Sequence, residues 1–111
     1  MPPRRSLSPT ALHILLAVAE GPRHGYAIKQ EVEGRSRGAV RLGPGTLYES
    51  IQRLLDGGLL RETDGDSAPA NGQEAQRRYY ELTGRGRTAL QDEVEQWRRF
   101  VDYAKRRLEP A

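Results

Sequence analysis

The last quarter of the chain carries an apolar seam that a small domain has little room to bury. Apolar side chains recur there at spacings of 4, 3, 4, 3 and 4 residues, which is the heptad pattern of a helix that packs along another helix. The seam consists of Leu90, Val94, Trp97, Val101, Ala104 and Leu108. We therefore predict one long helix over residues 86–108. We expect its seam to face a second copy of the chain; the alternative is that it packs on its own domain.

Composition excludes several classes of protein. The chain has 111 residues, no cysteine and two histidines. Without cysteine it forms neither disulfides nor thiolate metal sites, and two histidines are too few for a multi-histidine site. No apolar run approaches the roughly 20 residues that span a bilayer. No nucleophile pairs with a base, and no glycine-rich phosphate loop ends in Lys-Ser or Lys-Thr. We expect no metal, no cofactor, no membrane contact and no enzymatic activity, and a cytoplasmic location.

The N-terminal segment imitates a secretion signal. Arg4 and Arg5 precede an apolar run over residues 12–19 that ends in Ala-Val-Ala, as a cleavage site does. However, His13 interrupts this run. Ser8-Pro9 is also a good helix start, with the serine hydroxyl as cap and proline as first helical residue. We therefore interpret residues 9–19 as a buried helix of the domain core.

Glycine and proline residues divide the middle of the chain into short helices and strands. The expected elements are helices over residues 24–33 and 44–56, an extended piece over 39–42, strands over 59–63 and 78–82, and a polar loop over 64–76. This order predicts a mainly α (α+β) fold: a winged helix-turn-helix with a two-stranded wing and a long C-terminal dimerisation helix. Residues 1–85 are expected to form the DNA-binding domain, with residues 86–111 as the dimerisation helix of the same structural unit.

The segment over residues 44–56 is the candidate reading helix. Its apolar stripe, Leu47, Ile51, Leu54 and Leu55, follows helical spacing. The opposite side presents hydroxyl, amide and charged groups that suit phosphates and base edges. These are Thr46, Tyr48, Glu49, Ser50, Gln52 and Arg53. The alternative is an ordinary amphipathic helix with a polar outside.

Basic residues gather on both sides of this helix. Residues 23–41 contain five basic and two acidic residues, and residues 77–87 contain four basic residues and one acidic residue. The stretch over 61–76 is net acidic, with one arginine and four acidic residues. A positive surface beside a helix that fits the major groove favours binding of nucleic acid. The alternative is that these charges are only solvated at the surface and have no binding role. Arg41, Arg77 and Arg78 are the flanking residues that we expect to touch DNA.

Four motifs, in this order and spacing, are similar to the PadR family of bacterial transcriptional regulators. They are His24-Gly25-Tyr26-Ala27-Ile28, Gly45-Thr46-Leu47-Tyr48, residues 54–60 with Gly57-Gly58, and Tyr79-Tyr80-Glu81-Leu82-Thr83-x-x-Gly86. The resemblance covers residues 7–108 and is closest to the short form with one terminal helix. It implies a winged-helix DNA-binding domain that dimerises through that helix and represses transcription at an inverted-repeat operator.

The same resemblance implies roles for single residues. It places Thr46 and Tyr48 at the DNA surface and makes Tyr26 a packing residue that braces its helix. Tyr80 is implied to lie in the second wing strand, where we expect it in the core. The chain departs from the family in Glu49, where proline is frequent, and in an acidic wing without a Gly-Arg tip. We therefore expect DNA contacts at the base of the wing.

Trp97 and Phe100 form a candidate ligand pocket. Aromatic side chains at a dimer axis can bound a flat apolar cavity. In short PadR-like regulators that bind drugs, a tryptophan on this helix lines such a pocket, so the resemblance implies a small aromatic effector. Plain interface packing of the two aromatics is the alternative.

Together these observations predict a dimeric, sequence-specific DNA-binding transcriptional regulator. We expect a repressor that binds double-stranded DNA through residues 44–56 and is released by a ligand or signal. The alternative is a winged-helix protein-interaction module that dimerises without reading DNA, which the acidic wing and Glu49 favour.

Overall fold

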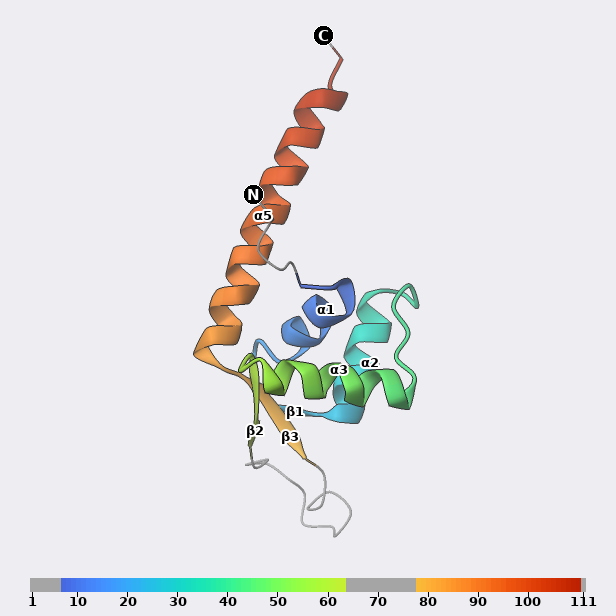
Figure 1. Cartoon of the computed structure of the whole chain (residues 1–111). Coiled ribbons are helices and arrows are strands. Elements are labelled where there is room, and N and C mark those ends of the chain that lie inside the picture. The colour runs from blue at the N-terminus through green and yellow to red at the C-terminus, as the bar shows by residue number, and fades with distance from the viewer. Residues whose placement is uncertain (1–6, 64–77, 111) are drawn as a thin grey trace.

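The computed structural model describes residues 7–63 and 78–110, and Figure 1 shows a body of short helices and a small sheet from which one long helix extends. The elements are α1 (Pro9–Ala17), β1 (Arg23–His24), α2 (Gly25–Arg35), α3 (Pro44–Asp56), β2 (Leu60–Thr63), β3 (Tyr79–Leu82) and α5 (Gly84–Leu108). The helices, the hairpin of β2 and β3 and the long last helix confirm the predicted order. Arg4, Arg5, Arg77 and the loop over residues 64–76 lie outside the described residues.

Side-chain caps determine where the first two helices begin. The Ser8 hydroxyl accepts a hydrogen bond from the N–H of Ala11 at 3.1 Å, and Pro9 occupies the first turn of α1. At α2, Nδ1 of His24 accepts from the N–H of Ala27 at 3.1 Å. Each cap satisfies an N–H group that the helix itself leaves without a partner. The predicted start of α1 is confirmed, and α1 ends at Ala17, two residues earlier than expected.

The core lies between α1, α2 and α3, with α1 at its centre. Its largest fully buried side chains are Ile14, Leu15, Val18, Ile28, Val32, Leu42 and Ile51. Three of these seven come from the apolar run over residues 12–19, which confirms the interpretation of that run as core. Residues 39–42, which we predicted as a short extended piece, form no strand of the sheet; Leu42 is buried as an irregular residue before α3.

The sheet has three strands, not the two that we predicted for the wing. Its order is β1-β3-β2, and both pairings are antiparallel. Arg23 and His24 pair with Tyr80 and Tyr79, so β1 ties the start of α2 to the wing. A two-residue strand has no measurable alternation, which is why the sequence pattern did not reveal it. Tyr80 is buried, as predicted.

The turn between α2 and α3 is organised by Glu33. One carboxylate oxygen accepts from Lys29 Nζ at 2.8 Å, and the other accepts from the N–H of Leu42 at 2.9 Å. The Ser36 hydroxyl accepts from the N–H of Val40 at 3.0 Å. The hydrogen bond from Lys29, followed by that from Leu42, lowers the pKa of Glu33 below its ordinary value. The ionised carboxylate therefore holds the segment that leads into α3.

The start of α5 is fixed by Thr83. Its hydroxyl donates to the carbonyl of Gly58 at 2.6 Å and accepts from the N–H of Gly86 at 2.9 Å. Its own N–H donates to the carbonyl of Leu59 at 3.1 Å. Because Thr83 is the cap, α5 begins at Gly84, two residues before the predicted start and inside the part that we assigned to the DNA-binding domain.

The first turns of α5 belong to the core of the same chain. Leu90, which we predicted to lie in a dimer interface, is buried in this core. That prediction is therefore corrected: the exposed seam begins at Val94. Nearby, the buried carboxylate of Glu93 accepts from the N–H of Leu7 at 2.6 Å. In residues 7–63 and 78–110, no helix combines the length and hydropathy needed to cross a membrane.

Replacement of Gly86 by alanine should destabilise the fold. A Cβ atom there would lie only 2.1 Å from the carbonyl oxygen of Leu59 and 2.9 Å from Leu82, so the start of α5 would have to shift. We expect a loss of about 2 kcal/mol or more in the free energy of unfolding, measured by urea denaturation. Gly84→Ala is the matched control, because a Cβ there meets nothing within 4 Å. Equal stability of the two variants would contradict this account of the α5 junction.

Replacement of Glu33 by glutamine should destabilise the protein at neutral pH and not in acid. Because folding lowers the pKa of Glu33, its stabilisation is present above the unfolded value and disappears as pH falls through the folded value. Urea denaturation at about pH 7 and about pH 3 should therefore show a difference between parent and variant only at the higher pH. Glu31→Gln is the control: the pKa of Glu31 is also lowered, chiefly by the hydrogen bond from Arg35 within α2, but its carboxylate holds no backbone of the turn, so its loss at neutral pH should be smaller. A difference of the same size at both pH values would refute the role of the charge.

Candidate nucleic-acid interface

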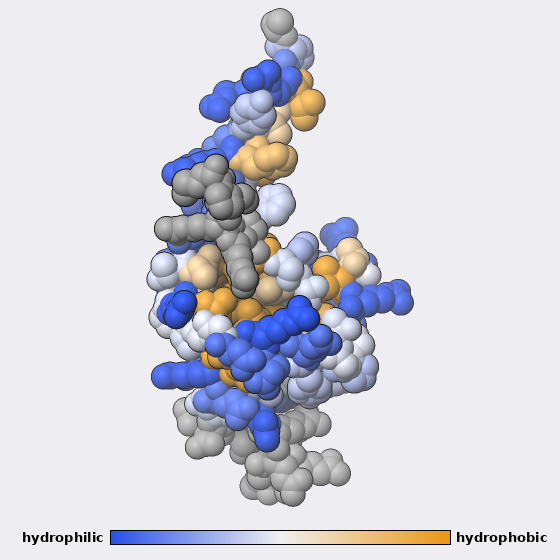
Figure 2. All heavy atoms as spheres, viewed as in Figure 1, coloured by the Kyte–Doolittle hydropathy of each residue, from blue (hydrophilic) through white to orange (hydrophobic). Residues whose placement is uncertain are grey.

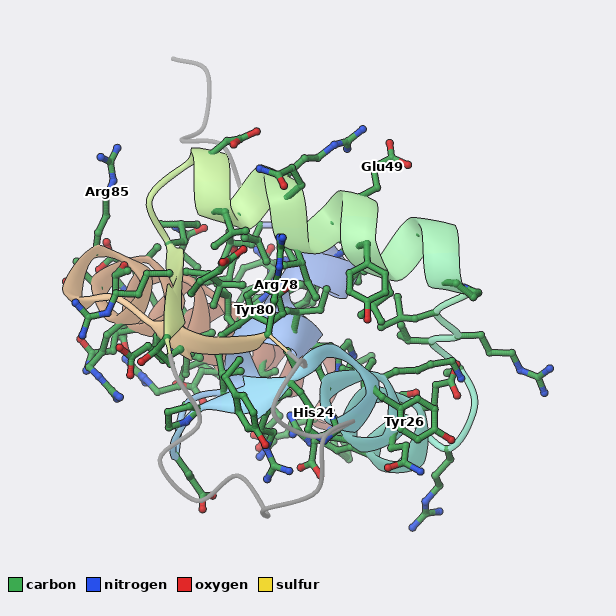
Figure 3. The ribbon with its side chains drawn as sticks, turned by 90° about the horizontal axis from the view of Figure 1, so that it is seen from below. His24, Tyr26, Glu49, Arg78, Tyr80 and Arg85 are labelled. Carbon is green, nitrogen blue, oxygen red and sulfur yellow. The ribbon has the colours of Figure 1, made fainter. Side chains whose placement is uncertain are left out.

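Helix α3 has one buried and one exposed face. Leu47, Ile51 and Leu54 enter the core, and Leu55 is partly buried, as predicted. The predicted reading face points outward: Thr46, Tyr48, Glu49, Gln52 and Arg53 are exposed, and Ser50 is half-buried. Figure 3 shows Glu49 directed away from the body of the domain. The helix thus offers a continuous polar face of the size that a major groove accepts.

Charged and amide groups on this face already bond along the helix. Arg53 donates to the carboxylate of Glu49 at 3.1 Å, and the Gln52 amide donates to Asp56 at 2.9 Å. Both are contacts between residues four apart on an exposed surface. Such exposed ion pairs are worth about 0.2–1 kcal/mol, so an incoming phosphate can compete for Arg53. Sequence spacing alone showed that Glu49 and Arg53 share a face, but not that they pair.

Tyr48 is positioned by a glycine on the neighbouring helix. A Cβ atom on Gly25 would lie 2.8 Å from the Tyr48 hydroxyl oxygen and 3.1 Å from its ring. The absence of a side chain at buried Gly25 therefore lets the tyrosine ring lie across the first turn of α2. Tyr48 keeps 52% of its surface exposed. Gly25 is a residue of the site that sequence reasoning missed; its place in the His-Gly-Tyr motif was the available signal.

Tyr26 is exposed, contrary to the packing role that the family resemblance implied. The buried row of α2 is Gly25, Ile28 and Val32, and Tyr26 does not belong to it. The side chain keeps 54% of its surface exposed and lies at the surface of α2 in Figure 3. A helix of eleven residues with one buried row leaves the adjacent position in solvent.

Arg78 lies at the base of the wing, immediately before β3. Burial raises the pKa of Tyr80, and the neighbouring Glu62 and Tyr48 raise it further, whereas Arg78 opposes them. Tyr80 is thus electrostatically coupled to Tyr48 of α3 and to Arg78, the residue that precedes β3. Arg78 donates to Glu62 at 3.3 Å across the hairpin, and its side chain is largely exposed. Arg41, the other described basic residue predicted here, is exposed before α3.

The predicted aromatic pocket is not a cavity of the single chain. Trp97 and Phe100 contact each other edge to face, with ring centroids 6.0 Å apart, and both are more than half exposed. A cavity of about 690 Å³ lies nearer the N-terminal end of α5, and neither Trp97 nor Phe100 lines it. Among the described residues, no group of three His, Asp or Glu side chains could hold a metal ion.

Comparisons with known proteins agree with this geometry. The sequence model of the transcriptional regulator PadR-like family matches residues 14–92. The transcriptional regulator Rv3488 of Mycobacterium tuberculosis is 38% identical over 86 residues, which cover 74% of this chain and 69% of that protein. The structure of a PadR family transcriptional regulator from Eggerthella lenta has a TM-score of 0.66 at 27% identity and covers 91% of this chain and 82% of its own.

A PadR family regulator from Clostridium difficile has the same fold. Its TM-score is 0.74 at 22% identity, over 92% of this chain and 100% of that one. The mostly helical architecture with a small antiparallel sheet is the winged-helix fold of these regulators. The chain therefore belongs to the PadR-like family of transcriptional regulators.

Proposed function

We propose that the chain is a homodimeric repressor, located in the cytoplasm, that binds an inverted-repeat operator through α3. The observation that carries this proposal is the polar outer face of α3, where Thr46, Tyr48 and Gln52 are exposed opposite the buried stripe. Hydroxyl and amide groups donate to phosphates, and an amide also pairs with adenine edges. Arg41 and Arg78 flank the same helix and supply positive charge.

The exposed seam of α5 supports dimerisation. Val94, Trp97 and Val101 are each about half exposed, and Leu108 is 82% exposed. In Figure 2 apolar residues line one side of α5 beyond the domain body. Burial of such a seam against a second copy stabilises both, at roughly 25 cal/mol per Å² of apolar surface. A two-fold dimer also gives two reading helices, which an inverted repeat one DNA turn apart requires.

The alternative of a protein-interaction module is favoured by the carboxylates that neutralise the reading face. Glu49 pairs with Arg53, and Glu62 pairs with Arg78.

The dependence of DNA affinity on salt concentration separates the two functions. For a DNA binder, the logarithm of the affinity should fall with the logarithm of salt concentration, with a slope near −0.9 per phosphate contact. DNA fragments of its own genome that the protein retains, identified by sequencing, would supply the operator for this titration.

Replacement of Tyr48 by alanine should weaken binding to the retained operator by about three- to tenfold, because one hydrogen bond to DNA is lost. Gel-shift titration measures the affinity, and sedimentation should show the dimer intact. Tyr48→Phe removes only the hydroxyl and keeps the ring over Gly25, so it should weaken binding to the same extent if the hydrogen bond is the cause. Unchanged binding of the alanine variant would reject α3 as the reading helix.

Trp97 is the proposed centre of an effector site, formed only when two copies meet. We expect planar aromatic compounds to quench the fluorescence of Trp97 and to release the protein from the operator. Trp97→Ala should weaken the dimer or change the response to those compounds, because an indole at the dimer axis contributes large apolar area. If the Trp97→Ala variant matches the parent protein in both sedimentation and ligand titration, this role of Trp97 is excluded. If no compound of a chemically varied panel changes the fluorescence of the parent protein, the pocket is excluded.

A further inference from the structure

An acid occupies the centre of the exposed face of α3. Glu49 lies two residues after Leu47 and two before Ile51, both buried, so it leaves the helix about 160° away from each of them at 3.6 residues per turn. Its side chain is 68% exposed and points away from the core in Figure 3. When this face enters the major groove, Glu49 approaches the base edges, whereas phosphates line the walls of the groove.

A carboxylate in this place has few partners on DNA. Phosphates are negatively charged and repel it. The donors that bases offer in the major groove are the amino groups of adenine and cytosine, and adenine also presents an acceptor ring nitrogen there, which repels a carboxylate. The amino group of cytosine is therefore the partner that suits Glu49, and it is the base contact that Glu and Asp side chains make in direct readout.

Arg53 adds donors beside this acceptor. Its Nη2 donates to Oε1 of Glu49 at 3.1 Å, and its side chain is 79% exposed. In the described part of the chain, the second carboxylate oxygen of Glu49 and the other N–H groups of Arg53 bond to no residue. The bonded pair thus presents a free acceptor next to free donors on the reading face.

We propose that Glu49 and Arg53 stay paired on DNA and together read one G·C base pair in each half-site of the operator. Glu49 accepts from the amino group of cytosine, and Arg53 donates to the carbonyl oxygen and ring nitrogen of guanine. This inference rests on the proposed DNA-binding function and names a base pair that α3 selects.

The order of polar groups on the base pairs explains the selection. A G·C pair offers two neighbouring acceptors followed by one donor, which is the complement of two donors from Arg53 beside one acceptor from Glu49. An A·T pair instead places its single donor between two acceptors. In either orientation on an A·T pair, at least one group of the protein faces a base atom that it cannot bond.

A base-pair scan of the retained operator with Glu49→Gln tests the acceptor. In the parent protein, replacement of C·G by T·A at one position of a half-site should weaken binding about tenfold, because the thymine oxygen then faces the carboxylate. In the variant this penalty should fall at least about threefold, since an amide can donate to that oxygen. Gel-shift titration at one fixed salt concentration measures all affinities.

Glu95→Gln is the matched control. Glu95 pairs with Arg98 and Arg99 on α5, so this variant also loses one negative charge and weakens exposed ion pairs. Its base preferences should equal those of the parent protein. If Glu49→Gln binds every operator variant more tightly by one common factor, Glu49 only repels phosphate and the proposal is overturned.

Arg53→Lys tests the donors. Lysine keeps the positive charge but lacks the planar fork that matches guanine, so the penalty for loss of the G·C pair should shrink while the salt dependence stays the same. A loss of affinity that is uniform across all operator variants would show that Arg53 contacts phosphate, and would overturn the shared reading of one base pair.

The same titrations separate this inference from the proposed function. A parent protein that retains no DNA fragments rejects DNA binding itself. A parent protein that binds its operator, but shows no base pair whose penalty depends on Glu49, rejects only the reading of a G·C pair.

Discussion

The geometry of this protein depends on the three hydrogen bonds of Thr83. They join the end of β3, the first turn of α5 and the backbone that follows α3. Because Gly86 has no side chain, α5 can approach the Leu59 carbonyl closely enough for these bonds to form. The direction of the long helix is therefore set by the same residues that end the reading helix and begin the wing. Any surface on α5 is thus held in a fixed relation to α3.

This coupling gives a physical route from the proposed dimer to DNA. Both α3 and α5 are attached to one junction, so a change in how two α5 helices pack would change the separation of two reading faces. A ligand shifts such an equilibrium only by the difference in its affinity for the two arrangements. A site around Trp97, between the two copies, is where that difference would arise.

Carboxylates hold the arginines of the reading face and the segment that precedes α3. Glu49 and Glu62 hold Arg53 and Arg78 in exposed pairs, and Glu33 holds the segment before α3. The exposed pairs are weak and can exchange for phosphate contacts. Glu33 differs because it bonds to the backbone of Leu42, so its charge supports the position of α3 and not its contacts. Carboxylates therefore serve two purposes here: Glu33 positions α3, and Glu49 and Glu62 neutralise arginines on the exposed surface.

Local sequence signals were enough to predict the helices and the hairpin of β2 and β3, because residue spacing and helix-end signals involve only neighbouring residues. The stripe of Leu47, Ile51 and Leu54 and the start at Ser8-Pro9 need only neighbouring residues to be recognised. Tertiary structure decided what each face meets. It added the two-residue strand β1, buried Leu90 in its own core and left Tyr26 exposed. Periodicity shows that a face is apolar, but not which segment covers it, and that choice depends on contacts between residues distant in the chain.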